Sequence, residues 1–202
     1  MNTVMRKGML AAIGLTFAGA MAAGGHGAAT ASTTSAPIMK PVAVVQNVSA
    51  DKSAPDTATL IPHGTQGPQS RIDLSNEQKA NAKAIVEATK KDGLDERAAV
   101  IAVATSMQES KLENLGHLGD ANDHDSLGLF QQRPSSGWGS PDQITDPQYA
   151  TTAFLNGLKN VGGWHDMPLT AAAQAVQVSA YPDAYAQWES QAADLVAQYW
   201  NS

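Results

Sequence analysis

The chain has 202 residues, no cysteine, and 19 acidic against 13 basic residues, which gives a formal net charge of −6 at pH 7. This composition excludes a fold held by disulfides, and without a visible basic cluster it disfavours nucleic acid as a partner. The length allows one domain with extensions.

The first 31 residues have the pattern of a secretory signal peptide. Arg6 and Lys7 form a basic start, residues 9–23 are apolar and rich in Ala and Gly, and Ala29-Thr30-Ala31 offers a small-residue cleavage site. The alternative is a retained membrane anchor, but the apolar run is Gly-rich and slightly short for a spanning helix. We therefore expect a secreted protein that is not stably inserted in a membrane after cleavage.

Residues 32–70 differ in composition from the rest of the chain. They hold five of the ten prolines, amid Ser, Thr, Ala and Gly. Such a segment buries too little apolar surface to offset the entropy lost on ordering it. We predict a disordered linker over residues 32–70 and a folded domain over residues 71–202.

The folded domain is predicted to be all-α, with about five helices around a central buried one. The first helix begins after Ser75, which has the spacing of a capping box with Gln78, and it ends at Gly93. Asp95 caps the second helix, which should stop near Ser110.

Three further helices are expected towards the C-terminus. Asp146-Pro147 combines an N-cap with a proline at the first helical position. A short helix is predicted over residues 171–180, with Thr170 as its cap and Val178 among its core candidates. The last helix should start near Asp183 and run to the end of the chain.

The second helix is predicted to be the central one, and it ends on Glu109. Residues 98–104 are apolar without interruption, so this helix is expected to be covered on every side. Burial and the negative end of a helix both raise the pKa of a carboxyl group. A carboxylic acid that stays protonated near neutral pH can act as a general acid. The alternative is a structural ion pair with Lys111 or Arg133.

An acid-rich loop is predicted between residues 111 and 127. Asp120, Asn122 and His124 have the spacing of the start of a calcium loop, but the required glycine and the distal glutamate are absent. His117 and His124 are interpreted as solvated loop side chains. We therefore predict no metal site and no cofactor.

Trp138 lies between two glycines, Gly137 and Gly139. Glycines beside an indole allow a ligand to approach closely, and the C–H faces of sugar rings pack on aromatic rings. A tryptophan that closes the edge of the core is an equally good interpretation.

Several ordered segments between about residue 80 and residue 200 resemble the lysozyme-like superfamily, which includes goose-type lysozymes and soluble lytic transglycosylases. They are Glu109-Ser110, Gly128-Leu129-Phe130-Gln131 and Ser179-Ala180-Tyr181-Pro182. Residues 125–135, 137–139 and 172–177 resemble in particular the exported actinobacterial transglycosylase-like domains. Ordered blocks of this kind are stronger evidence for a fold than for an activity.

This resemblance implies a lysozyme-like fold and cleavage of peptidoglycan between N-acetylmuramic acid and N-acetylglucosamine. It further implies association with the cell wall, with other cell-wall enzymes among the candidate partners. We also predict a monomer. Glu109 matches the catalytic acid. Ser110, Gln131 and the backbone of Leu129 and Phe130 match residues that contact or position the substrate. Tyr181 matches the tyrosine whose hydroxyl orients the catalytic glutamate.

Two positions depart from the family pattern. Pro182 replaces an asparagine, and Arg133 stands where goose-type enzymes carry an acid. An inverting hydrolase would need a base, for which Asp123 and Asp125 are the candidates, although both also fit a loop-capping role. A lytic transglycosylase needs no such base, so we predict that activity. A hydrolase and a non-catalytic peptidoglycan-binding module remain the alternatives.

Overall fold

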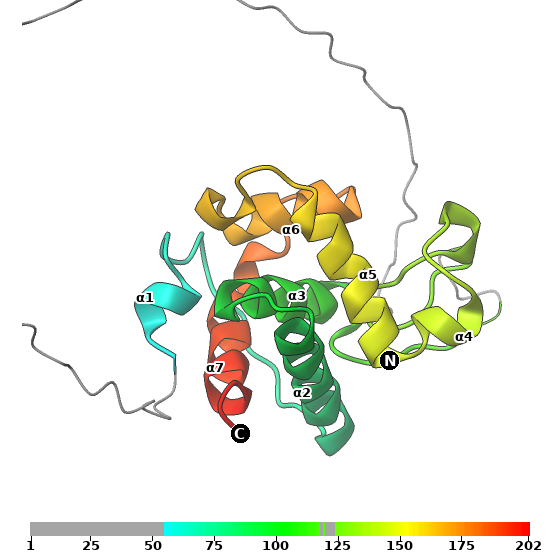
Figure 1. Ribbon diagram of the computed structural model, residues 1–202, viewed down its shortest axis with the longest axis horizontal. Coiled ribbons are helices and arrows are strands. Elements are labelled where there is room, and N and C mark those ends of the chain that lie inside the picture. The colour runs from blue at the N-terminus through cyan, green and yellow to red at the C-terminus, as the bar shows by residue number, and fades with distance from the viewer. Residues whose placement is uncertain (1–54, 118, 120–123) are drawn as a thin grey trace, which may run out of the picture. The chain divides into compact units, whose positions relative to one another are not determined.

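The computed structural model describes residues 55–117, 119 and 124–202, and within these residues the chain is helical without a β-strand (Figure 1). The predicted signal peptide and the part of the predicted linker before residue 55 lie outside the described residues. The seven α-helices are α1 (Thr57–Leu60), α2 (Asn76–Lys91), α3 (Glu96–Ser110), α4 (Pro141–Ile144), α5 (Pro147–Lys159), α6 (Leu169–Gln177) and α7 (Glu189–Tyr199). The all-α prediction is confirmed, with seven helices where about five were expected. No helix in the described part of the chain is long and apolar enough to cross a membrane.

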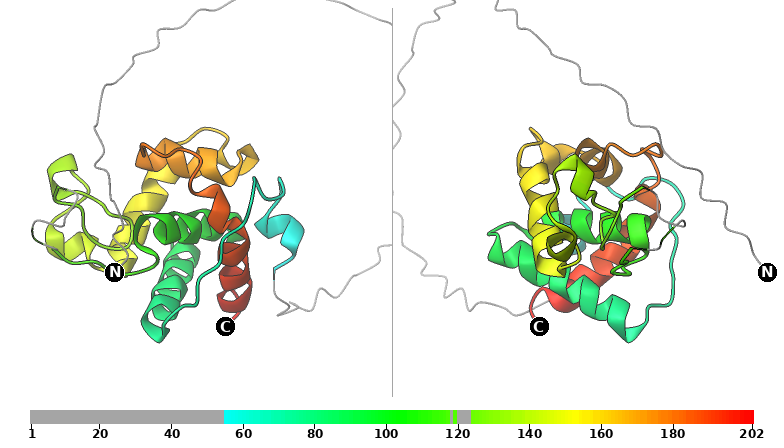
Figure 2. Two further views of the ribbon diagram at one scale, coloured as in Figure 1. Left: turned by 180° about the vertical axis from the view of Figure 1, so that it is seen from behind. Right: turned by 90° about the vertical axis from the view of Figure 1, so that its right-hand side faces the viewer.

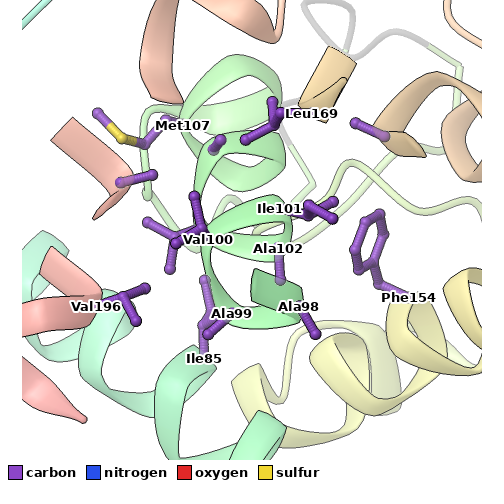
Figure 3. Packing of buried hydrophobic residues seen from close by; sticks show 14 of the residues in the cluster. Ile85, Ala98, Ala99, Val100, Ile101, Ala102, Met107, Phe154, Leu169 and Val196 are labelled. Carbon is purple, nitrogen blue, oxygen red and sulfur yellow. The ribbon is translucent and has the colours of Figure 1, made fainter. Parts of the chain in front are cut away.

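Helix α3 is the centre of the core, as predicted. Every residue from 97 to 107 is buried, and α2, α5, α6 and α7 all pack against the helix. Figures 1 and 2 show α3 in the middle of the helices, with α2 and α7 on one side and α6 on the other. In the close view of the core, side chains of α3 meet Ile85 of α2, Phe154 of α5, Leu169 of α6 and Val196 of α7 (Figure 3).

The predicted helix starts at Ser75 and Asp95 are confirmed by the capping hydrogen bonds. The Ser75 hydroxyl accepts from the backbone N–H of Gln78, and the Gln78 side chain accepts in return from the backbone of Ser75. Asp95 accepts from the N–H of Ala98 at 3.1 Å. Asp146 caps α5 in the same way, with Pro147 at the first position. These caps set the directions in which α2, α3 and α5 leave their loops.

The prediction of a disordered linker is wrong for residues 55–70, which we call the strap. The strap contains α1, and Leu60 at the end of α1 is only 3% exposed. The Leu60 carbonyl accepts a hydrogen bond from the guanidinium of Arg97 at 2.9 Å, and Figure 1 shows α1 beside α3 and α7. One buried leucine and a few directed hydrogen bonds hold a segment whose composition is otherwise typical of a linker.

A buried ion pair joins α3 to α7. Arg97 and Glu189 are 2.7 Å apart, and their side chains are 3% and 1% exposed. Because two buried charges depend on each other for compensation, this pair ties the strap, α3 and α7 into one unit.

Helix α6 and the start of α7 differ from the prediction. Helix α6 begins at Leu169, with Pro168 and not the predicted Thr170 at the N-cap position, and Leu169, Ala172 and Ala173 form its buried face. It ends at Gln177, and Val178, predicted to be in the core, is left-handed and 72% exposed. The last helix was predicted to start near Asp183, but residues 182–185 form a turn, and the short 3-10 helix η4 (Ala186–Trp188) precedes α7.

Candidate active site at the end of helix α3

Glu109 lies half-buried in the last turn of α3, where a tyrosine hydroxyl meets its carboxyl group. The Tyr185 hydroxyl donates to Oε1 of Glu109 over 2.7 Å, and the whole Tyr185 residue is buried. Tyr185 comes from the segment just before η4, 76 residues further along the chain. The hydrogen bond therefore fixes the orientation of the glutamate from outside its own helix.

Tyr185 is a permanent hydrogen-bond donor at neutral pH. Burial, followed by the negative charge of Glu109, raises the pKa of Tyr185 well above its usual range, although a hydrogen bond with Ser179 works in the opposite direction. The phenol of Tyr185 therefore keeps its proton and donates it in the hydrogen bond to Glu109.

The orienting tyrosine predicted from the resemblance was Tyr181, and this assignment is wrong in the structure. Tyr181 is 58% exposed, whereas the hydroxyl on Glu109 belongs to Tyr185. Both tyrosines lie in the same non-helical segment, four residues apart, so neither helical periodicity nor a capping signal could distinguish them. As a surface residue, Tyr181 remains a candidate for contacting a ligand.

The turn at residues 128–131 supports the end of α3 from within the core. The Ser110 hydroxyl lies 2.8 Å from the carbonyl oxygen of Leu129, and Gln177 donates to the carbonyl of Phe130 at 2.9 Å. Leu129 and Phe130 are 0% and 1% exposed, and the Phe130 ring stacks on Phe154. The side chains of Leu129 and Phe130 therefore belong to the core, and the lining of a substrate cleft by their backbone stays a prediction. Ser110 is buried as well and joins the helix to the turn.

The same turn depends on Gly128 and places Gln131 in a strained conformation. Gly128 has φ +72°, and a Cβ atom there would lie 2.1 Å from the carbonyl oxygen of Ile144. Gln131 has φ +50°, and its side-chain amide donates to the carbonyl of Gly128 at 3.1 Å. Left-handed non-glycine residues are uncommon and concentrate at functional sites, so the half-buried Gln131 stays a substrate-binding candidate.

Asp125, one of the two candidate bases, is engaged in the loop. It accepts from Arg133 Nε at 2.8 Å, and from the backbone N–H and the hydroxyl of Ser135 at 2.8 and 2.9 Å. These contacts, chiefly that with Arg133, hold the pKa of Asp125 well below its usual range. A carboxylate of such low basicity is a poor general base, which favours the loop-capping alternative. Asp123, the other candidate, lies outside the described residues, as do Asp120 and Asn122 of the calcium-like pattern.

Trp138 is half-buried next to α5. Its carbonyl accepts from the Tyr149 hydroxyl at 3.3 Å, and a Cβ atom on Gly139 would lie 2.9 Å from the Tyr149 ring. The close packing of Gly139 against the Tyr149 ring therefore explains why a glycine follows Trp138. Both interpretations of the Trp138 ring, as a surface on which a sugar packs and as a side chain that closes the edge of the core, stay predictions.

A second set of polar contacts surrounds Gln108, the neighbour of Glu109, and no motif pointed to it. Its side-chain oxygen accepts from the indole N–H of Trp188 at 2.8 Å and from the amide of Gln187 at 3.1 Å. The ammonium of Lys111 lies 4.6 Å from the centre of the Trp188 ring. These contacts anchor the end of α3 to η4, which directly follows Tyr185.

Two hollows on the surface of the described residues are not lined by Glu109. One, of about 490 Å³, has strap residues 66–68 on one side and Ala186 and Gln187 on another. The second, of about 300 Å³, lies between α2 and the start of α5. Within the described residues, no group of three or more His, Cys, Asp or Glu side chains could hold a metal ion.

Comparison with known proteins does not assign a family. No protein-family model and no curated protein matches this chain. We therefore infer the function from the arrangement of the residues.

Proposed function

We propose that this chain is a peptidoglycan lytic transglycosylase with a lysozyme-like fold. One observation carries the proposal: the carboxyl group at the end of the buried helix α3, Glu109, is held by the hydroxyl of the buried Tyr185 at 2.7 Å. A single acid held in one orientation is what general acid catalysis at a glycosidic bond requires. The resemblance of the segments around Glu109 and Gln131 to lytic transglycosylases supports the choice of substrate.

In the proposed reaction Glu109 acts twice. As an acid it gives its proton to the glycosidic oxygen, and the bond from that oxygen to C1 of N-acetylmuramic acid breaks. The 6-hydroxyl of the same sugar then bonds to C1, and the Glu109 carboxylate takes the proton that this hydroxyl loses. The products are a 1,6-anhydro end and a free 4-hydroxyl on N-acetylglucosamine, and the enzyme returns to its starting state without a metal or a cofactor.

The environment of Asp125 supports a transglycosylase over an inverting hydrolase. A hydrolase needs a second carboxylate to activate water, and the contacts of Asp125 with Arg133 and Ser135 make it a weak base. Intramolecular attack by the 6-hydroxyl avoids this requirement, because Glu109 itself is available as the base after the first step.

The proposed place of action is outside the cell, at the wall. The signal-peptide pattern of residues 1–31 supports export, and peptidoglycan glycan strands are the proposed partner. We further propose that the chain acts as a monomer, beside other enzymes of the cell wall.

The test compares the mature chain from residue 32 with its Glu109→Gln variant on purified peptidoglycan, with the products identified by mass spectrometry. The substitution keeps an acceptor oxygen for the Tyr185 hydroxyl and removes the transferable proton, so the variant is expected to fold and to be inactive. Anhydro-ended muropeptides from the wild type alone would support the transglycosylase. Reducing ends would favour a hydrolase and direct attention to Asp123. No cleavage, with binding to the wall retained, would favour the binding module.

A further inference from the structure

The end of the strap is hydrogen-bonded to the segment that follows Tyr185. The Gln69 amide donates to the carbonyl of Ala186 at 3.0 Å, and its oxygen accepts from the N–H of Ser190 at 2.9 Å. Ser70 donates from its backbone to the carbonyl of Gln187 at 2.7 Å and from its hydroxyl to the Gln187 side chain at 2.8 Å. Two consecutive strap residues therefore make four hydrogen bonds that span η4 and the first turn of α7.

The same segment is connected to the residue before the catalytic glutamate. Gln187, whose side-chain oxygen accepts from Ser70, donates with its amide to Gln108 at 3.1 Å. Trp188 donates to the same oxygen of Gln108 at 2.8 Å. The contacts thus reach both members of the Glu109–Tyr185 pair, since η4 directly follows Tyr185 and Gln108 directly precedes Glu109.

Helix η4 depends on these external contacts. It is a three-residue 3-10 helix with no side-chain cap, so its own backbone restrains it weakly. Because η4 directly follows Tyr185, a shift of η4 would move the backbone of Tyr185 with it. A displacement of about 1 Å at a reacting group can cost about a hundredfold in rate.

We propose that Gln69 and Ser70 are positioning residues that hold Tyr185, through η4, in hydrogen-bonding distance of Glu109. This inference rests on the proposed transglycosylase activity for its kinetic consequences. It makes the end of the strap, Gln69 and Ser70, a part of the active-site support, which a domain cut at residue 71 lacks.

A contact with substrate is the competing role, because strap residues 66–68 form a wall of the 490 Å³ hollow together with Ala186 and Gln187. The two roles predict different kinetics. Loss of positioning lowers kcat, whereas loss of a contact made equally before and during the reaction raises KM.

The experiment uses the mature chain carrying Ser70→Ala or Gln69→Ala, with Ser70→Thr as the conservative variant. We expect kcat to fall about tenfold in both alanine variants, with KM within about twofold of wild type, because the reacting geometry loosens while substrate binding persists. Ser70→Thr keeps a hydroxyl and should restore most of kcat. The matched control is Asp56→Ala, which removes the N-cap of α1 in the same strap, far along the chain from Gln69, and should leave kcat unchanged.

A second readout does not depend on activity. The indole N–H of Trp188 reports the Gln108 contact, and its NMR signal can be identified by its loss in Trp188→Phe. We expect faster exchange of this proton in Ser70→Ala and Gln69→Ala but not in Asp56→Ala. If the wild type cleaves no peptidoglycan, the proposed function fails, while the indole proton still tests the coupling. A change in KM alone, an equal loss of kcat in Asp56→Ala, or an unchanged indole proton in both alanine variants would overturn the positioning role.

Discussion

Replacing Tyr185 by phenylalanine removes a single hydroxyl from the proposed active site. The ring is fully buried and keeps its packing, so the main loss is the 2.7 Å hydrogen bond to Glu109. A hydrogen bond to a charged group contributes about 1.5–3 kcal/mol. If all of this energy holds the glutamate in its reactive orientation, the conversion of about 1.4 kcal/mol for each tenfold change gives a loss of kcat of about 10- to 100-fold.

Tyr181→Phe is the matched control, because it removes the same atom from a tyrosine four residues away. Tyr181 is 58% exposed and does not supply the hydroxyl on Glu109, so kcat should stay close to that of the wild type. The assay is the initial rate of release of anhydro-ended muropeptides over a range of substrate concentrations. Thermal unfolding of both variants shows whether each still folds, with an expected decrease of a few degrees for Tyr185→Phe because the hydrogen bond to the half-buried Glu109 is lost.

The opposite order of the two variants would refute the reasoning. If Tyr181→Phe lowered kcat more than Tyr185→Phe did, Tyr181 would orient Glu109 during catalysis, as the family resemblance implies. The contact between Tyr185 and Glu109 would then be structural only. Equal and small effects in both variants would show that no tyrosine hydroxyl orients the glutamate.

Three further predictions concern stability and the choice between the two reactions. Arg97→Ala leaves Glu189 buried without its cation, so the free energy of unfolding in urea should fall by about 3–5 kcal/mol. Gly128→Ala places a Cβ atom against the Ile144 carbonyl and should cost about 2 kcal/mol or more in the same assay, whereas Gly116→Ala, which points into open space, should have little effect. Asp125→Asn should retain release of anhydro ends, and loss of that release would point to a catalytic base. Because the contacts with Arg133 and Ser135 depress the pKa of folded Asp125, its contribution to stability is fully present above the pKa of the unfolded chain and is lost as the pH falls from there through the folded pKa. The free energies of unfolding of wild type and Asp125→Asn should therefore converge only at strongly acid pH.

Interactions between near neighbours along the chain determined the starts of α2, α3 and α5, and the sequence was sufficient to predict these three. The capping box of Ser75 and Gln78 and the caps at Asp95 and Asp146 each join residues three positions apart. Such bonds join residues that are close in the sequence, so their residue pattern is visible without tertiary information. The uninterrupted apolar run of α3 likewise determined which helix is central, because only a fully covered helix can bury apolar residues on every face.

The position of the acid was also determined by the sequence, but not its partners. Glu109 closes the predicted central helix, as the structure has it. Its hydroxyl donor is separated from it by 76 residues, and the choice of Tyr185 over Tyr181 depends on how α6, η4 and α7 pack around the end of α3. The two tyrosines are equivalent by composition and local pattern, so only tertiary packing distinguishes the buried one from the exposed one.

The contacts that order the strap also could not be predicted from the sequence. Its residues are mostly small or polar, and composition measures only how much apolar surface a segment can bury. What holds the strap is a single buried leucine together with hydrogen bonds to Arg97, Ala186, Gln187 and Ser190, partners that lie 37 to 121 residues away in the chain. Bonds over such separations have no local signature, because each depends on a donor and an acceptor that the folded core brings together. The sequence alone therefore determined the capped helices α2, α3 and α5 and the position of the candidate acid, and the tertiary structure decided which residues hold that acid in place.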